Sequence, residues 1–128
     1  MRFDQDELRR HLFGEQPRAE VLIGESGRSP CGFALFFHNF STFEGKPSLY
    51  LEDLFVVPEA RGRGLGRMLL RELARIAVDR GCSRLEWTVL DWNEPAIGFY
   101  KKLGAESLDD WTVFRIAGDA LRRLADEV

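Results

Sequence analysis

The most constraining feature of this sequence is a glycine-rich turn between an apolar strand and an amphipathic helix. The strand is predicted over Leu49–Val57 and the helix over Gly64–Arg80. Between them, Gly62, Gly64 and Gly66 let the backbone approach a ligand and adopt torsions that other residues avoid. The first N–H groups of a helix have no intrahelical partner, and together with the helix dipole they favour an anion. The turn therefore predicts a site for a phosphate or a pyrophosphate.

Arginines flank these glycines and help to exclude the commonest explanations of such a turn. Arg61, Arg63 and Arg67 add positive charge beside the predicted anion site. The dinucleotide-binding fingerprint requires glycine where Arg67 stands, and the chain contains no Gly-Lys-Ser/Thr string of a P-loop. A flexible connector without a ligand is the remaining alternative. The position of the turn between a strand and a helix favours a ligand over that connector.

The rest of the pattern predicts one layered α/β domain with a mixed sheet over residues 1–128. Helices are expected over Asp4–Phe13 and Pro95–Leu103, followed by a final helix that Asp119 caps and that runs through Leu121, Leu124 and Val128. Strands are expected over Ala19–Glu25, Phe33–Phe37, Leu85–Leu90 and Trp111–Ile116, with a polar loop over Asn39–Ser48. Gly81 is expected in the left-handed conformation that ends a helix.

Composition and charge argue against several classes of protein. The 128 residues are 45% hydrophobic and 30% charged, an ordinary globular balance. A net charge of -3 argues against a general nucleic-acid binder, and no apolar run approaches the roughly 20 residues of a membrane span. The N-terminal residues lack the apolar core of a signal peptide, and the two cysteines form no Cys/His cluster with metal-ligand spacing. A cytoplasmic protein that binds no metal, nucleic acid or membrane is expected.

Three segments together resemble one family. Arg61–Gly66 resembles the Arg/Gln-x-x-Gly-x-Gly/Ala motif of the GNAT superfamily of N-acetyltransferases, which binds the pyrophosphate of acetyl-coenzyme A (acetyl-CoA). Leu49–Val56 and Trp92–Lys101 are similar to the diamine and polyamine N-acetyltransferase branch. The resemblance implies an α/β (α+β) fold with a mixed, mostly antiparallel central sheet flanked by helices. That fold begins with a strand and a helix before the segment matching Asp4–Phe13, so an N-terminally short domain lacking both is expected.

Glu52 is the candidate base for acetyl transfer to an amine. An alkylammonium ion with a pKa of ~10.4 must lose a proton before it attacks, and a positioned carboxylate assists. Glu52 lies in an otherwise apolar strand beside Asp53, and strand alternation sends the two side chains to opposite faces. The resemblance implies that Glu52 binds the amine and acts as the base, directly or through water. The alternative is a structural ion pair or a capping carboxylate, and Asp53 is expected to be structural.

Tyr100 is the candidate general acid on the predicted helix after Asn93. A phenol there can protonate the departing thiolate, and the resemblance implies this role. The alternative is a core tyrosine packed against Phe99. The resemblance also implies that Asn93 contacts coenzyme A (CoA), with a helix cap as its alternative. Cys82 follows a helix C-terminus, where the dipole disfavours a thiolate, so transfer is expected to proceed directly rather than through a cysteine.

The predicted site extends beyond these groups. The resemblance implies that the backbone of Leu54–Val56 bonds the pantetheine arm. The predicted cofactor-binding residues are Leu54, Phe55, Val56, Arg61, Gly62, Arg63, Gly64, Leu65, Gly66, Arg67, Asn93, Ala96 and Tyr100. The predicted substrate contacts are Glu52, Phe43 and Asp109, with Glu44 and Asp110 as further candidates, because carboxylates and an aromatic face suit an alkylammonium ion. Trp87, Trp92 and Trp111 are expected in the core or at an interface.

These observations predict an acetyl-CoA-dependent N-acetyltransferase that needs no metal. Its substrate is expected to be a primary amine of a small cation, such as a diamine, a polyamine or a lysine analogue. One alternative is an acetyltransferase that modifies protein or peptide amines. Another is a CoA-binding module with little activity, because the first strand and helix of the family are missing. The resemblance implies a homodimer.

Overall fold

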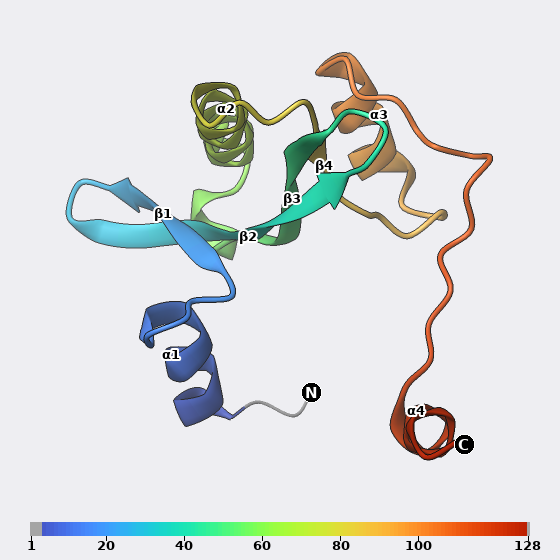
Figure 1. Ribbon diagram of the computed structural model, residues 1–128. Coiled ribbons are helices and arrows are strands. Elements are labelled where there is room, and N and C mark those ends of the chain that lie inside the picture. Colours follow the sequence, from blue (N-terminus) through green and yellow to red (C-terminus); the bar gives the residue numbers. More distant parts are fainter. Residues whose placement is uncertain (1–3, 128) are drawn as a thin grey trace. The chain divides into compact units, whose positions relative to one another are not determined.

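The computed structural model describes residues 4–127, so the predicted contribution of Val128 to the last helix lies outside the described residues (Figure 1). The elements are α1 (Gln5–Phe13), β1 (Glu20–Ser26), β2 (Ser29–Ser41), β3 (Lys46–Val56), the short 3-10 helix η1 (Pro58–Ala60), α2 (Leu65–Asp79), β4 (Leu85–Glu86), α3 (Glu94–Lys102) and α4 (Gly118–Ala125). Contacts along the chain divide it into two compact units, one ending at Thr88 and the other beginning at Val89. No described helix is long and apolar enough to span a bilayer.

The first unit contains a four-stranded sheet with the order β1-β2-β3-β4. β1, β2 and β3 pair antiparallel, and β4 pairs parallel with β3. This arrangement confirms the predicted mixed, mostly antiparallel sheet.

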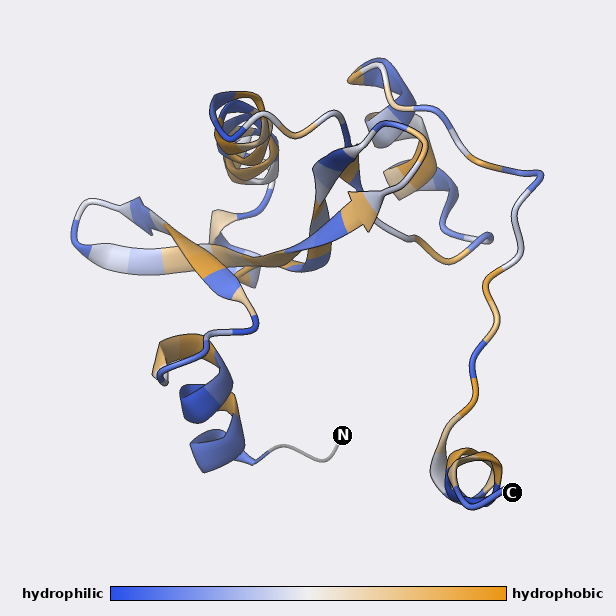
Figure 2. Ribbon diagram, in the orientation of Figure 1, coloured by the Kyte–Doolittle hydropathy of each residue, from blue (hydrophilic) through white to orange (hydrophobic). Residues whose placement is uncertain are grey.

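The core of this unit lies between the sheet and α2. Alternate strand residues such as Ala34, Phe36 and Leu51 are buried, and residues at helical spacing on α2 cover them. Leu49 of β3 and Leu73 of α2 are each 0% exposed, and burying a leucine contributes about 2 kcal/mol. Figure 2 shows hydrophobic residues along the sheet and on one side of α2. The predicted helix and its apolar stripe are confirmed.

Two strand glycines allow the start of α2 to lie close to the sheet. A Cβ atom added at Gly32 would lie 2.5 Å from the carbonyl oxygen of Phe55, and one at Gly24 would lie 3.0 Å from Cδ1 of Leu65. Gly32 therefore requires glycine because β3 passes close to it, and Gly24 leaves room for the side chain of Leu65; neither glycine is explained by backbone torsion. The contacts of Leu65 with Gly24 and Gly32 place the first turn of α2 against β1 and β2.

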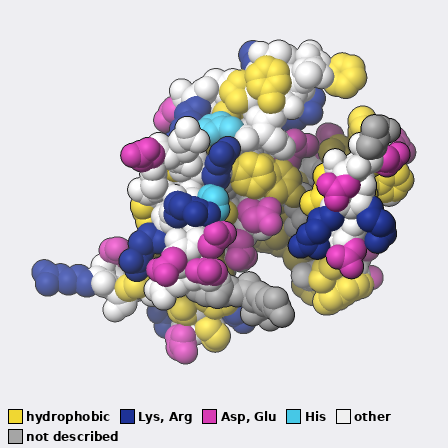
Figure 3. Space-filling model, turned by 60° about the horizontal axis from the view of Figure 1, so that its bottom comes forward, with side chains coloured by type: hydrophobic (Ala, Val, Ile, Leu, Met, Phe, Trp, Pro, Cys, Tyr) yellow, Lys and Arg dark blue, Asp and Glu magenta, His cyan; other side chains and the backbone are white. Residues whose placement is uncertain are grey.

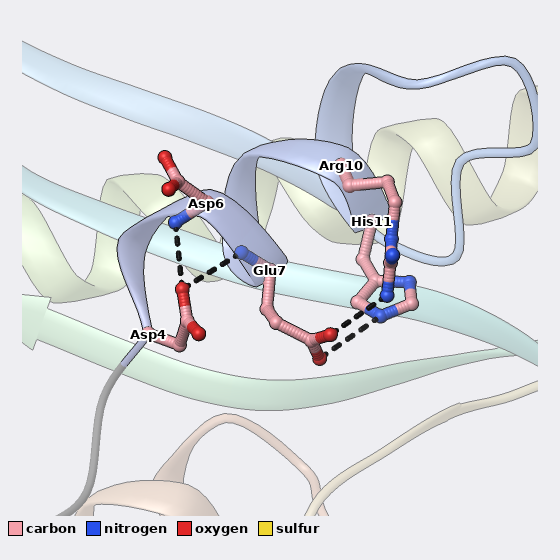
Figure 4. A network of polar contacts seen from close by, with 5 residues as sticks. All are labelled: Asp4, Asp6, Glu7, Arg10 and His11. Carbon is pink, nitrogen blue, oxygen red and sulfur yellow. Dashed lines mark hydrogen bonds and ion pairs between the residues drawn. The ribbon is translucent and has the colours of Figure 1, made fainter.

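α1 is a locally stabilised helix at the start of the described chain. Asp4 caps it, and its Oδ1 atom accepts hydrogen bonds from the backbone N–H groups of Asp6 at 3.0 Å and Glu7 at 3.1 Å (Figure 4). Glu7 then pairs with Arg10 at 2.8 Å and with His11 at 3.8 Å, at helical spacing. The predicted helix ending at Gly14 is confirmed.

The hairpin between β2 and β3 is longer than predicted. Asn39 pairs with Ser48 and Phe40 with Pro47, so the expected polar loop over Asn39–Ser48 is wrong and the turn is confined to residues 42–45. Once two antiparallel strands are in register, backbone pairing continues through polar side chains because the hydrogen bonds do not depend on them. β4 is shorter than predicted, since only Leu85–Glu86 pairs with β3.

The second unit contains α3 and α4, and it corrects two predictions. Residues 111–116 form no strand, and the side chains of Val113 and Phe114 are 80% and 92% exposed. A strand requires a partner ladder, and the described part of this unit contains no strand to supply one. Ala117, not Asp119, is the N-cap of α4, while Asp119 lies in the first turn and pairs with Arg122 at 3.2 Å.

Candidate functional site

A β-bulge lies at the predicted base. Leu35 pairs with Asp53 while Phe36 pairs with Leu51, so Glu52 is an extra residue in β3. The alternation that would separate Glu52 from Asp53 is interrupted at this point, because a bulge re-aims the side chains beside it. Both side chains are exposed and form no hydrogen bond or ion pair with another described residue. Neither carboxylate is therefore part of the core, and nothing in the described residues supports the structural ion pair.

Beyond the bulge, one edge of β3 has no strand beside it within the described residues. β4 pairs only with Leu49 and Tyr50, whereas β3 continues to Val56. The segment predicted to bond a pantetheine arm, Leu54–Val56, lies along this continuation. Backbone groups on an unpaired strand edge can bond an extended ligand in the way another strand would.

The glycine turn follows directly and leaves open space in front of α2. Gly62 and Gly64 both have φ of 80°, a conformation that favours glycine. Gly64 is the N-cap of α2, and no side chain caps this end. A Cβ atom added at Gly62, Gly64 or Gly66 would meet no atom within 4 Å. Gly66 has no positive φ, so neither torsion nor crowding within the chain explains its glycine, and the close approach of a ligand stays the prediction for it.

The arginines of the turn differ from one another. Arg63 and Arg67 are exposed and form no hydrogen bond or ion pair with another described residue. Arg67 lies in the first turn of α2, which contains no acidic residue, and a cation there is disfavoured by about 0.3–1 kcal/mol. A bound anion would reverse that cost. The donor set of backbone N–H groups and free guanidinium groups therefore fits the diphosphate of CoA.

Arg61 is the exception among these arginines. Its Nε donates to the carbonyl oxygen of Val56 at 3.0 Å, and its guanidinium carbon lies 5.8 Å from the centroid of the Phe55 ring. The side chain is therefore attached to the end of β3, a contact that the sequence analysis did not predict.

The second unit carries Tyr100 on α3. Tyr100 is half-buried, and its ring centroid lies 5.6 Å from that of Phe99. Burial raises the pKa of the Tyr100 phenol, so the group keeps its proton at neutral pH. A proton donor to a thiolate requires this state.

Asn93 begins α3 as its cap. Its Oδ1 accepts a hydrogen bond from the backbone N–H of Ala96 at 3.3 Å. The helix-cap alternative for Asn93 is therefore confirmed as its local role, while the contact of Asn93 and Ala96 with CoA stays a prediction.

The predicted substrate contacts lie in turns. Phe43 is 92% exposed at the tip of the β2–β3 hairpin. Its neighbour Glu44 pairs with Arg84 at 3.5 Å, so part of its charge is already compensated. In the second unit, Asp109 accepts a hydrogen bond from Oγ of Ser107 at 3.3 Å, and Asp110 is exposed.

Two of the three tryptophans lie outside the core, so the interface remains the prediction for them. Trp92 and Trp111 are 75% and 73% exposed, so in this structure neither belongs to the core. Trp87 is half-buried. Among the described residues, no group of three or more His, Cys, Asp or Glu is arranged to hold a metal ion.

The two units divide the predicted site between them. The first brings Glu52, the edge at Leu54–Val56 and the glycine turn into one continuous stretch of β3, η1 and α2. Asn93, Ala96, Tyr100 and Asp109 belong to the second unit.

Comparisons with known proteins agree with this geometry. A family model described as "Acetyltransferase (GNAT) family" matches residues 2–105. Thialysine N-epsilon-acetyltransferase of Bos taurus is 39% identical over 136 residues, covering 98% of this chain and 79% of that protein. Spermidine/spermine N(1)-acetyltransferase-like protein 1 of Homo sapiens is 33% identical over 131 residues, covering 94% of this chain and 19% of that protein. The structure of an integron cassette protein from V. cholerae superimposes with a TM-score of 0.84 and 32% identity, covering 98% of this chain and 80% of that one.

Proposed function

The chain belongs to the GNAT family of acetyltransferases and is an N-acetyltransferase, and from this premise we propose that it transfers acetyl directly from acetyl-CoA to a primary amine of a small cation. A diamine, a polyamine or a lysine analogue fits, because relatives are named for thialysine and for spermidine or spermine. The observation that carries the proposal is the open N-terminus of α2, where two left-handed glycines expose backbone N–H groups without a cap. The family match runs across the boundary between the units, which supports a single domain over residues 1–128.

The residues of the first unit suit the cofactor. When bound, acetyl-CoA supplies the activated acetyl group as a thioester. The backbone at Gly62–Gly66 would hold the diphosphate, with Leu65 in the same turn, and Arg63 and Arg67 would add charge. The edge at Leu54–Val56 would bond the pantetheine arm. Asn93, Ala96 and Tyr100 are the remaining proposed cofactor contacts.

Glu52 is the proposed base and part of the proposed substrate site. Its carboxylate is exposed and has no partner among the described residues, so it is available to an alkylammonium ion. At pH 7 an amine with a pKa of ~10.4 loses its proton at a cost of about 4.6 kcal/mol. Glu52 would attract the cation and pass its proton to water. Phe43 and Asp109 are the other proposed contacts.

Replacing Glu52 tests this role. Glu52→Gln is expected to lower kcat/KM for the amine about tenfold, with the larger effect at low pH, where amines are most protonated. Asp53→Asn is the matched control, because it removes the adjacent exposed carboxylate. Steady-state kinetics across pH 6–9 would measure both, and a negligible, pH-independent effect of Glu52→Gln would contradict the assignment.

Tyr100 is the proposed general acid because its phenol is neutral and half-buried. Tyr100→Phe is expected to lower kcat about 100-fold or more while changing the Kd for acetyl-CoA less than about twofold. Tyr50→Phe is the matched control, since the chain has two tyrosines and Tyr50 packs on Phe37 in the sheet. Unchanged turnover in Tyr100→Phe would refute the role.

An acetyl-transfer assay on a panel of amines tests the function as a whole. Diamines, polyamines and lysine analogues are expected to be acetylated faster than peptide amines. Preference for peptides would favour a protein acetyltransferase. Acetyl-CoA binding without turnover on any amine would favour the binding module.

A homodimer is part of the proposal. The support is the exposure of Trp111, Val113 and Phe114 in the second unit, because large apolar side chains at a surface favour association. Light scattering would measure the mass in solution, and a monomer at micromolar concentration would contradict the dimer. A cytoplasmic location is also proposed, supported by the unpaired thiols of Cys31 and Cys82.

A further inference from the structure

The Arg61 side chain makes two contacts with the end of β3. Its Nε donates to the carbonyl oxygen of Val56 at 3.0 Å, and its guanidinium lies over the ring of Phe55 at 5.8 Å from the centroid. Both partners are the last residues of β3. The guanidinium is therefore held along the strand by a hydrogen bond and a cation–π contact.

The same residue is also fixed through its backbone. The N–H of Arg61 donates to the carbonyl oxygen of Pro58 at 3.3 Å, and Arg61 is the C-cap of η1. The next residue is Gly62 in the left-handed conformation. Arg61 thus joins the end of β3 to the first residue of the glycine turn.

Arg63 and Arg67 show the opposite behaviour. Each lies within a few residues of Arg61 and is exposed, yet neither bonds another described residue. An arginine that serves mainly as phosphate charge is expected to resemble these two.

We propose that Arg61 is a positioning residue that fastens the glycine turn to the end of β3, and that Arg63 and Arg67 supply the positive charge for the diphosphate. The inference rests on the proposed function for the identity of the ligand. It replaces the prediction that the Arg61 side chain binds the cofactor directly. This positioning role depends on the hydrogen bond that a nitrogen at the position of Nε donates to the carbonyl oxygen of Val56.

Three substitutions at Arg61 separate positioning from charge. In glutamine, Nε2 is the same number of bonds from Cα as Nε in arginine, so Arg61→Gln keeps the donor and removes the charge. Arg61→Lys keeps the charge but places its nitrogen one bond farther out. Arg61→Ala removes both. Arg67→Gln is the matched control for loss of charge in the same turn.

Calorimetric titration with CoA at low and high salt distinguishes the outcomes. Arg61→Ala is expected to weaken CoA binding about tenfold relative to the parent chain. Arg61→Gln is expected to bind CoA within about threefold of the parent affinity, and Arg61→Lys is expected to bind more weakly than Arg61→Gln. The salt dependence should stay that of the parent in all three, whereas Arg67→Gln should flatten it. Rescue by lysine rather than glutamine, or a flattened salt dependence in Arg61→Gln, would overturn the proposal.

A second measurement needs no ligand. In the 15N-labelled free protein, the Nε–H of Arg61, identified by its loss in Arg61→Gln, is expected to exchange with water several-fold more slowly than those of Arg63 and Arg67. Equal exchange rates would overturn the proposal. If the parent chain does not bind CoA, the proposed function fails, while this exchange measurement still decides the placement of Arg61.

Discussion

The two ends of α2 are built in opposite ways. At the C-terminal end the chain satisfies its own carbonyl groups: Gly81 donates to Val78 at 3.1 Å and Cys82 donates to Ala77 at 2.9 Å. Gly81 has a φ of 73°, as predicted, and the pair of bonds forms a Schellman motif. At the N-terminal end, Gly64 is left-handed too, but no side chain caps the helix.

Side chains repeat this contrast. Arg80 at the C-terminal end forms two hydrogen bonds with Glu20, at 2.6 and 2.9 Å, and its guanidinium lies 6.0 Å from the ring centroid of Phe36. His38 Nε2 lies 3.5 Å from Arg80 Nη1. Figure 3 shows histidine, basic and acidic side chains close together on one face. At the other end, Arg63 and Arg67 have no such partners among the described residues.

The difference supports the proposal that the N-terminal end of α2 binds a ligand. At a helix end whose backbone groups already have partners within the chain, few hydrogen-bonding groups remain for a ligand. An end with open N–H groups and unpaired cations favours an anion, which supports the proposed diphosphate site. The predictions below test this contrast.

The largest effect is expected at Gly64. Gly64→Val forces a β-branched residue to a φ of 80° and places its side chain in the open space, so affinity for acetyl-CoA should fall about 100-fold. Gly27→Val is the matched control, because Gly27 has a φ of 64° and equally free space in the β1–β2 turn. Calorimetry would measure both variants, and tight binding by Gly64→Val would contradict the assignment of the turn.

Gly66 offers a sharper test because stability and affinity should change in opposite directions. In Gly66→Leu the added Cβ meets no atom within 4 Å and no positive φ opposes it, so the variant should stabilise the helix by roughly 0.5–1 kcal/mol. Affinity for acetyl-CoA should fall about tenfold, because a leucine side chain, unlike the glycine or alanine of the motif, would fill the space proposed for the ligand. Urea unfolding and calorimetry give the two values.

Ala74→Gly on the exposed side of α2 is the control for the change in helix propensity in Gly66→Leu. It should destabilise the helix by up to about 1 kcal/mol and leave affinity unchanged. If Gly66→Leu bound acetyl-CoA as tightly as the parent, the space in front of the helix would not belong to the ligand.

Features with a local signal were predictable from the sequence. The spacing of Leu69, Leu73 and Ala77 predicts α2 and its buried side, and α1 was predicted to within one residue, with Asp4 as its N-cap rather than its first residue. Gly81 is in the expected left-handed conformation for the same reason, because helix termination depends on neighbouring residues.

Features that depend on distant partners were not predictable in this way. The apolar segment 111–116 resembles a strand, but strand formation needs a ladder that the segment itself does not encode. The bulge at Glu52, by contrast, is visible in the spacing of apolar residues in the sequence. The inward-facing Leu49 and Leu51 are two apart, whereas Leu51 and Leu54 are three apart, which breaks strict alternation.

The candidate site shows the same division. The glycine turn was recognisable because strand, glycines and helix are consecutive. The different roles of Arg61 and its neighbours were not, because residue type alone does not show that one guanidinium bonds Val56 while two remain open. The roles assigned to Glu52 and Tyr100 stay predictions until the variants are measured.

The smallest effect is expected at the C-terminal end of α2, the closed end, where the chain supplies its own hydrogen-bond partners. The hydrogen bond from Arg80 holds the pKa of the Glu20 carboxyl below its ordinary value. The pair therefore stabilises the folded state above the unfolded-state pKa of about 4.3, and this contribution is lost as the pH falls through the lower folded-state pKa. Glu20→Gln should lower the free energy of unfolding by about 0.5–1 kcal/mol at pH 7, because both side chains remain partly exposed to solvent.

The pH dependence and a matched ion pair decide this last prediction. The difference between Glu20→Gln and the parent in urea unfolding should shrink below about pH 4, while affinity for acetyl-CoA at pH 7 stays unchanged. Glu72→Gln removes a pair with Arg75 at 3.2 Å within α2 and should change stability by only about 0.2–0.5 kcal/mol. A loss of acetyl-CoA affinity in Glu20→Gln would mean that the two ends of α2 are coupled, and the contrast between a closed end and an open end would fail.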